Sequence, residues 1–228
     1  MNLTLEKKIE QNQFPILVSL PKNDIDLAKA ALGAGADGIK VHLNAHHVAS
    51  GTVFGDFQAE RKFLESLAKL STTKLIMIGQ EKLPSDGELK LLAQMGFEGF
   101  NLYLKHAEPR LFHTDLRPIL ALENGYQLED IHQITAHKNA WIEASIIHSR
   151  DYGQPLSSDD LHHYLDISAH SKRPVIVPTQ KKITTQDLSK LREAGASAVL
   201  IGIIVMGSTI QSVSQKIGEF VKARTTVN

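Results

Sequence analysis

The chain of 228 residues is predicted to fold as a (β/α)8 TIM barrel, a single domain that spans residues 1–228. A repeated pattern is the first observation: a helical segment runs into glycine, small or acidic residues follow, and an apolar stretch comes next, at 31–41, 91–102 and 191–201. The second is that eight apolar strand candidates alternate with helical patterns. The third is the length of the repeating unit: each strand–helix unit takes about 28 residues, close to the minimum for a βαβ crossover. Eight units use almost the whole chain, which favours a closed barrel over an open doubly wound sheet, the alternative fold.

The elements follow in chain order. Strands are expected at 16–20, 38–43, 74–79, 99–104, 118–122, 140–147, 174–178 and 198–203. Helices are expected at 25–32, 59–70, 87–94, 109–116, 128–137, 159–168, 185–193 and 209–221. Ser85 with Glu88 and Ser157 with Asp160 have the spacing of helix-starting capping boxes. Gly195 and the equivalent glycines of the other two copies stand where a helix ends in the left-handed conformation.

Composition excludes several classes of function. Because 25 basic residues balance 25 acidic ones, the chain lacks the basic surface of a nucleic-acid-binding or polybasic membrane-surface protein. Without cysteine there is no disulfide framework, zinc–thiolate site or thiol nucleophile. The first residues are too polar for a secretory signal, and the longest apolar run, 198–207, is about half a membrane span. A cytoplasmic protein without nucleic-acid or membrane partners is therefore expected.

Polar residues on the predicted strands need a reason, since parallel strands of α/β proteins are normally apolar on both faces. On the second strand, Lys40 and His42 alternate with Ile39, Val41 and Leu43, so the polar set is expected to point into the barrel and the apolar set toward the helices. The same alternation, or a place at a strand end, selects Ser19, Asn44, Gln80, Asn101, Tyr103, Lys105, Glu123, Glu143 and Ser145.

Lys40 and Glu143 form the central candidate pair. Strands two and six face each other across an eight-stranded barrel, so the two side chains are expected to meet, directly or through a substrate. One interpretation is a structural ion pair that plugs the barrel; the other is an acid/base pair at the mouth, which the polar inward residues of several strands favour. Lys40, Glu143 and His42 are the candidate catalytic residues. The candidate substrate-binding residues are Asn44, Asn101, Tyr103, Lys105, Glu123 and Gln180.

Three histidines lie at or after the second strand: His42, His46 and His47. They could ligate a metal, but no inward acidic residue lies beside them and the third strand carries no histidine, so no metal is expected. Hydrogen bonding near a phosphate or carbonyl group is the favoured role. The loop at 45–57 is long for a βα loop and is interpreted either as a lid over the mouth or as a surface excursion.

The last two strand ends suggest a phosphate site. Thr179 follows strand seven, and Gly202, Gly207 and Ser208 follow strand eight, where barrel enzymes usually bind phosphate with small residues and free backbone N–H groups. The segment 195–213, GASAVLIGIIVMGSTIQSV, resembles the closing strand and helix of the ribulose-phosphate-binding barrel superfamily, including its N-acetylmannosamine-6-phosphate 2-epimerase-like branch. The resemblance implies a small phosphorylated substrate held at Gly202, Gly207 and Ser208, and it transfers no catalytic residue.

The leading functional hypothesis is an isomerase or epimerase of a small phosphorylated sugar or related metabolite, acting by proton abstraction next to a carbonyl. Glu143 would be the base, Lys40 the electrostatic stabiliser and His42 a proton shuttle or hydrogen-bond donor. A lyase or aldolase with a Schiff base on Lys40 or Lys105 is the second hypothesis. A non-catalytic barrel that binds a phosphorylated metabolite is the third. No cofactor is expected, and a homo-oligomer stays open.

Overall fold

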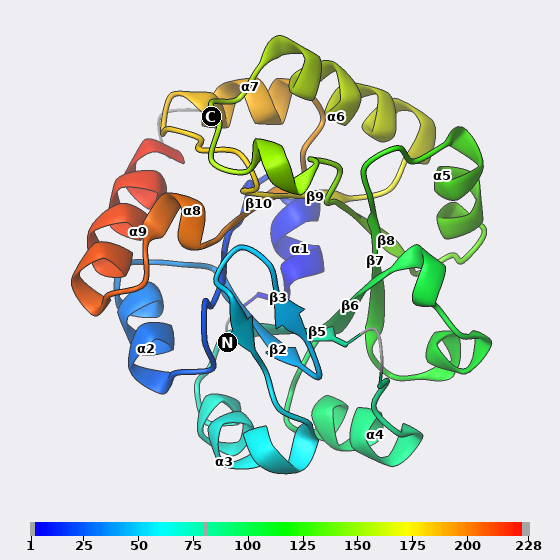
Figure 1. Cartoon of the computed structure of the whole chain (residues 1–228), viewed down its shortest axis with the longest axis vertical. Coiled ribbons are helices and arrows are strands. Elements are labelled where there is room, and N and C mark those ends of the chain that lie inside the picture. Colours follow the sequence, from blue (N-terminus) through cyan, green and yellow to red (C-terminus); the bar gives the residue numbers. More distant parts are fainter. Residues whose placement is uncertain (1–2, 80–81, 225–228) are drawn as a thin grey trace.

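The computed structural model describes residues 3–79 and 82–224 and shows a closed barrel of eight parallel strands surrounded by helices (Figure 1). The predicted (β/α)8 fold is confirmed. The order around the barrel is β1-β10-β9-β8-β7-β6-β5-β2, so that β2 and β8 lie on opposite sides. The barrel strands are β1 (Ile16–Ser19), β2 (Gly38–Leu43), β5 (Thr73–Ile78), β6 (Gly99–Tyr103), β7 (Arg117–Leu122), β8 (Trp141–Ala144), β9 (Val175–Pro178) and β10 (Ala198–Ile201).

Helices fill the connections between the strands. Those at predicted places are α2 (Ile25–Gly33), α3 (Phe57–Ala68), α4 (Asp86–Gln94), α5 (Leu128–Thr135), α6 (Ser158–Ser171), α7 (Asp187–Glu193) and α9 (Ile210–Arg224). The capping boxes at Ser85 and Ser157 are both present. Gly195 takes a φ of 82° after α7, as its place in the pattern predicts.

Some boundaries and elements differ from the sequence predictions. The segment predicted as a helix at 109–116 contains the short 3-10 helix η2 (Pro109–His113), and another, η1 (Leu104–His106), precedes it. Strand β8 stops at Ala144 instead of continuing to 147, because the chain bends there and Ser145 N donates to Glu143 O over 3.0 Å. Strand β10 stops at Ile201, because Gly202 begins a further short helix.

Several elements were not predicted: α1 (Leu5–Glu10), α8 (Ile203–Met206), and the strands β3 (His46–His47) and β4 (Thr52–Val53) of a hairpin. The 3-10 helix η1 and a third one, η3 (Ser149–Asp151), which follows β8, were not predicted either. The hairpin occupies the long loop after β2 and crosses the mouth of the barrel in Figure 1.

The apolar residues form two cores. The larger lies between the strands and the helices and includes Ile39, Val41 and Leu43, which confirms that this set faces outward. The smaller core fills the barrel interior on the side of α1, where Leu5 packs with Trp141 and other inward residues. Glu98 accepts a hydrogen bond from Leu5 N over 2.9 Å at the same end. Because α1 and this layer close one end, the open end is the carboxyl side of the strands.

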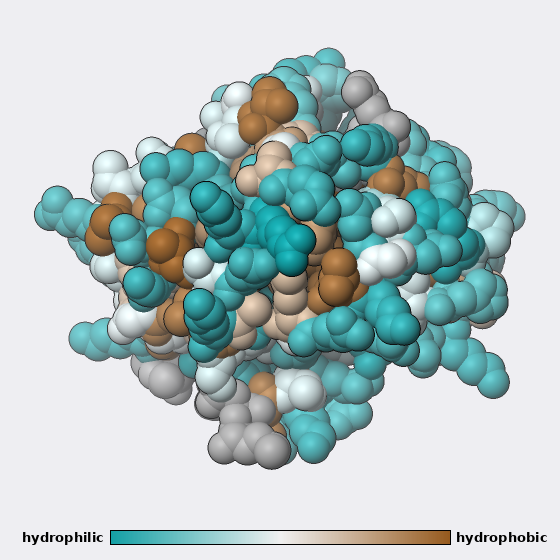
Figure 2. All heavy atoms as spheres, turned by 90° about the horizontal axis from the view of Figure 1, so that it is seen from below, coloured by the Kyte–Doolittle hydropathy of each residue, from teal (hydrophilic) through white to brown (hydrophobic). Residues whose placement is uncertain are grey.

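Apolar side chains are sparse on the face seen in Figure 2, where they lie in small separate groups among hydrophilic residues. None of the helices within residues 3–79 and 82–224 has the length and apolar character needed to cross a membrane.

Candidate functional site

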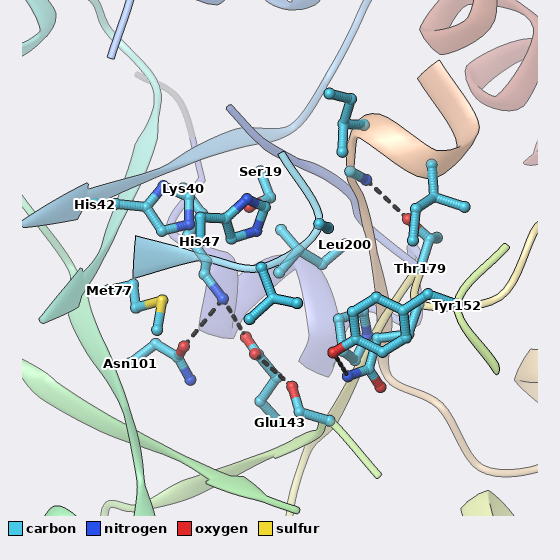
Figure 3. A pocket seen from close by; sticks show the side chains of 18 of the residues that line it. Ser19, Lys40, His42, His47, Met77, Asn101, Glu143, Tyr152, Thr179 and Leu200 are labelled. Carbon is cyan, nitrogen blue, oxygen red and sulfur yellow. Dashed lines mark hydrogen bonds and ion pairs between the residues drawn. The ribbon is translucent and has the colours of Figure 1, made fainter. Parts of the chain in front are cut away.

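A cavity of about 180 Å³ lies at the carboxyl ends of the strands, the end at which barrel enzymes keep their active sites. Its floor and walls come from the strands, and its cover comes from the hairpin and α8 (Figure 3). The lining residues from the strands and the segments directly after them are Ser19, Lys40, His42, Met77, Asn101, Tyr103, Glu143, Ser145, Tyr152, Pro178, Thr179, Gln180, Leu200 and Gly202. Those from the hairpin and α8 are His46, His47, Val48, Ala49, Ile203 and Ile204.

Lys40 and Glu143 meet in this cavity, as their strands' opposite positions predict. Lys40 Nζ lies 2.7 Å from Glu143 Oε2, and the two side chains are only 5% and 6% exposed. A second hydrogen bond runs from Lys40 Nζ to Asn101 Oδ1 over 3.0 Å. Since an ammonium group has three N–H donors and two are used by these acceptors, one stays available to a ligand in the cavity.

Both partners of Lys40 are themselves held in place. Glu143 Oε1 accepts from Ser145 Oγ over 3.0 Å, so each carboxylate oxygen has a donor. Asn101 Nδ2 donates to Ile119 O over 2.9 Å, which turns the amide oxygen toward Lys40. This network satisfies the charges that burial would otherwise penalise, and it fixes the ammonium and carboxylate groups with little freedom.

Two tyrosines and a glutamine form another wall. Gln180 Nε2 donates to Tyr152 Oη over 2.8 Å, while Gln180 Oε1 accepts from Ile147 N over 3.1 Å. Burial is the main cause that raises the pKa of both Tyr103 and Tyr152 above the ordinary value. The phenols therefore stay protonated near neutral pH and serve as hydrogen-bonding groups.

Two histidines at the mouth, His42 and His47, are uncharged near neutral pH. Burial is the main cause that holds the pKa of His42 well below its usual range, and the proximity of His47 and Lys40 acts in the same direction. Burial, with Lys40 and His46, lowers the pKa of His47 to about 4. His47 Nδ1 lies 2.8 Å from Ser50 Oγ. Within residues 3–79 and 82–224, no group of three or more acidic, histidine or cysteine side chains is arranged to hold a metal ion.

The end of the cavity opposite the histidines is built around Thr179 and Gly202. Thr179 Oγ1 accepts from Gly202 N over 2.8 Å, and Thr179 N donates to Leu200 O over 2.9 Å (Figure 3). Gly202 is the N-cap of helix α8, and the N–H groups of Ile203 and Ile204 in its first turn have no helical acceptor.

Two of the predicted phosphate-binding residues lie elsewhere. Gly207, with a φ of 72°, follows the last residue of α8, and the exposed Ser208 comes after it. Neither lines the cavity. The unpredicted helix α8 is the reason, because it occupies the four residues between Gly202 and Gly207.

Three predicted substrate-binding residues also lie outside the cavity lining: Asn44, Lys105 and Glu123. Asn44 takes a φ of 50° just after β2, so the two-residue alternation that grouped it with Lys40 has ended there. Lys105 lies in η1 beyond the end of β6, and it pairs with Glu123 on the surface. The alternation rule applies only within a strand, and both strands end before these residues. Gln80 lies outside the described residues.

Sequence reasoning missed several lining residues. Tyr152 and the pair Ile203 and Ile204 lie in segments that follow β8 and β10. Val48 and Ala49 belong to the hairpin. Their position after a strand is the signal that could have found them, since every segment that follows a barrel strand starts at the mouth.

Comparison with protein-family models finds no match, and comparison with curated proteins finds no significant sequence similarity. Solved structures do resemble the chain. Thiamine phosphate pyrophosphorylase from Pyrococcus furiosus matches with a TM-score of 0.65 at 13% identity, over 96% of this chain and 98% of the other. Tryptophan synthase from M. tuberculosis matches with a TM-score of 0.71 at 12% identity, over 96% of both chains.

Phosphoribosyl anthranilate isomerase from Thermus thermophilus also matches, with a TM-score of 0.63 at 11% identity, over 94% of this chain and all of the other (100%). At such low identity the likeness is one of architecture. The chain therefore shares the (β/α)8 fold of these enzymes, and its chemistry has to be argued from its own cavity.

Proposed function

We propose that this protein is an isomerase or epimerase of a small phosphorylated sugar or related metabolite, and that it moves a proton at a carbon next to a carbonyl group. The observation that carries the proposal is the buried Lys40–Glu143 pair in the wall of the mouth cavity. The branch of C2 epimerases acting on N-acylamino sugar phosphates falls within this class.

The pair has the two groups that such a reaction needs. The third N–H of Lys40 can donate to a substrate carbonyl oxygen and stabilise the negative charge that develops there. Glu143 Oε2 lies 2.7 Å from the same nitrogen, so the carbon beside that carbonyl would lie near the carboxylate. Because Glu143 Oε2 accepts one hydrogen bond, from Lys40, its second lone pair can accept the proton as general base.

The phosphate group would bind at the Thr179 and Gly202 end. Among the described residues that line the cavity, Lys40 is the one lysine or arginine, and Glu143 already neutralises it. Backbone N–H groups of Ile203 and Ile204 are therefore the donors proposed for the phosphate, together with the hydroxyl of Thr179. The names of two similar structures, thiamine phosphate pyrophosphorylase and phosphoribosyl anthranilate isomerase, support a phosphate-bearing ligand.

Deuterium incorporation from D2O tests the reaction, because proton abstraction next to a carbonyl washes deuterium into that carbon. A panel of aldose phosphates, ketose phosphates and N-acylamino sugar phosphates would be followed by proton NMR. The double variant Lys40→Met/Glu143→Gln removes both charges together, so the buried pair leaves no unpaired charge behind. We expect it to lose about 10²–10⁴-fold in exchange rate.

Lys216→Met/Glu219→Gln, which removes an exposed lysine–glutamate pair on α9, is the matched control and should retain the wild-type rate. Normal exchange in Lys40→Met/Glu143→Gln, or no exchange by the wild type with any compound of the panel, would refute the proposal. Thermal stabilisation by a phosphorylated compound without exchange would point instead to a binding protein.

Schiff-base chemistry is the second candidate, because Lys40 Nζ lies in the cavity beside a carboxylate that could move protons. Borohydride reduction in the presence of phosphorylated keto acids would trap such an adduct as a mass increase on Lys40. Deuterium exchange without a trapped adduct supports the isomerase, and an adduct on Lys40 supports the lyase.

A further inference from the structure

His42 is fully buried, and neither of its ring nitrogens has a hydrogen-bond partner. The neighbouring buried polar residues Lys40, Asn101 and Glu143 are all hydrogen-bonded. Burial of an unpaired polar group costs about 1–3 kcal/mol, so an imidazole with two unpaired nitrogens is unfavourable as a packing residue.

The β3–β4 hairpin covers this imidazole. The ring of His47 lies 4.7 Å from the ring of His42, centroid to centroid, and the ring of Phe54, which directly follows β4, stacks on it at 4.5 Å. The hairpin is thin, since each strand has two residues, and Val48 and Val53 are 63% and 77% exposed.

One side-chain hydrogen bond ties the hairpin to the segment after β1, because Thr52 Oγ1 donates to Pro21 O over 2.8 Å. The hydrogen bond from Phe54 N to Ala45 O, over 2.8 Å, closes the base of the hairpin itself. A segment with two-residue strands and exposed apolar side chains can open at a much lower free energy than the barrel can unfold. Its opening would let water or a ligand reach the nitrogens of His42.

We propose that His42 recognises an uncharged oxygen function of the ligand, a hydroxyl group above all, and that the β3–β4 hairpin is the lid that opens to let the ligand reach it. This deepens the proposed function by naming a second recognition point, away from the phosphate end. The inference depends on the proposed function for the phosphate-binding end of the cavity, but it does not depend on the proposed reaction.

The chemistry of the ring selects the ligand group. A neutral imidazole offers one donor and one acceptor, and a hydroxyl group can pair with either nitrogen, while a phosphate dianion can only accept from the N–H. The low pKa of His42, caused first by burial, keeps the ring in this neutral form, and the adjacent Lys40 opposes a second positive charge. The ligand hydroxyl would thus bind at His42, while phosphate binds at Thr179 and Gly202.

Thiol labelling tests the lid, and the absence of cysteine from the wild type makes each labelling site unique. His42→Cys and Val41→Cys place a thiol at adjacent, fully buried positions of β2, the first under the lid and the second toward the helices. We expect Cys at 42 to react with iodoacetamide at least about tenfold faster than Cys at 41, since only the first is exposed by lid opening. Equal rates, set by global unfolding, would overturn the lid.

Substitution of the ring tests recognition. His42→Phe keeps a ring between His47 and Phe54 but removes both unpaired nitrogens, so its melting temperature should rise by about 2–4 °C. His42→Leu gives a second, smaller apolar variant. His162→Phe on the exposed face of α6 is the matched control and should leave the melting temperature unchanged. If both His42→Phe and His42→Leu melt below the wild type, His42 is a structural residue and the proposal is wrong.

Binding of two phosphate esters gives the direct readout. Glycerol 3-phosphate carries two hydroxyl groups that propyl phosphate lacks, and the phosphate is common to both. We expect the wild type to bind glycerol 3-phosphate about tenfold more tightly, His42→Phe to lose this preference, and His42→Gln, with its own donor and acceptor, to regain part of it. No preference in the wild type, including no binding of either ester, would overturn the recognition. A preference without deuterium exchange would support His42 while the proposed reaction fails.

Discussion

Two lysine–glutamate pairs lie at the carboxyl ends of the barrel strands, and they differ in surroundings more than in geometry. Lys40 and Glu143 reach across the barrel with an N–O distance of 2.7 Å and are 5% and 6% exposed. Lys105 and Glu123 follow the neighbouring strands β6 and β7, lie 2.5 Å apart, and are 52% and 48% exposed. The shorter pair is the one in water.

The difference shows that distance does not measure the importance of an ion pair. Water screens and solvates the exposed pair, which is expected to contribute about 0–1 kcal/mol to stability. The buried pair depends on Asn101 and Ser145 to complete its hydrogen bonds, and loss of one partner leaves a buried charge. In the proposed function, burial also lets the inner pair act, because charges held away from water interact strongly with a bound substrate.

The largest effect is expected from breaking the buried pair one residue at a time. Lys40→Met leaves the buried Glu143 carboxylate unpaired and should lower the free energy of unfolding by about 3–5 kcal/mol, measured by urea titration. Lys40→Met/Glu143→Gln should lie within about 1 kcal/mol of the wild type, because no unpaired charge remains. Equal losses in the single and double variants would show that the pair is not coupled.

The next largest effect is expected from acid, which should lower the stability of the folded protein through the buried histidines at the mouth. The pKa of His47 is lowered from 6.5 to about 4, so between these pH values the unfolded chain binds a proton that the folded chain does not, and stability falls as the pH drops through this window. His42 acts in the same direction, because burial lowers its pKa too. Lys40 and His46, the other titratable groups that act on His47, are untouched in the variants compared here.

His42→Phe/His47→Phe should therefore lose less stability than the wild type between pH 7 and pH 5, as followed by thermal melts. His162→Phe, on the exposed face of α6, should keep the wild-type pH dependence. The same slope in all three proteins would contradict neutral burial of the two histidines.

A smaller effect is expected from Asn101→Leu, which tests whether the buried pair needs its neighbours. The change removes one acceptor of Lys40 and the donor to Ile119 O, so unfolding should become easier by about 1–3 kcal/mol. A urea titration measures it, and an unchanged midpoint would show that water replaces the amide.

The smallest effect is expected from Lys105→Met. Because Glu123 stays solvated, the free energy of unfolding should change by less than about 1 kcal/mol, and the difference should shrink further at high salt. Parallel urea titrations at low and high ionic strength check this. A loss comparable with that of Lys40→Met would remove the contrast between the two pairs.

Much of the fold could be read from local patterns. The glycines after the helices, the capping boxes and the apolar runs placed most barrel elements, and alternation on β2 separated Ile39 and Val41 from Lys40 and His42. Alternation failed at Asn44 and Lys105, where the strands had already ended. Short elements such as α1 and α8 escaped because a few residues carry too little periodicity to be recognised.

The sequence by itself determined the alternation of strands and helices, the inward set of polar residues and the pairing of Lys40 with Glu143, because these follow from local periodicity and from the symmetry of an eight-stranded barrel. Only the tertiary structure decided which polar residues share the cavity, that α8 moves the free backbone N–H groups to Ile203 and Ile204, and that a hairpin buries His42 without a partner. Burial and the absence of a hydrogen-bond partner depend on segments distant in sequence, and local pattern carries no information about them.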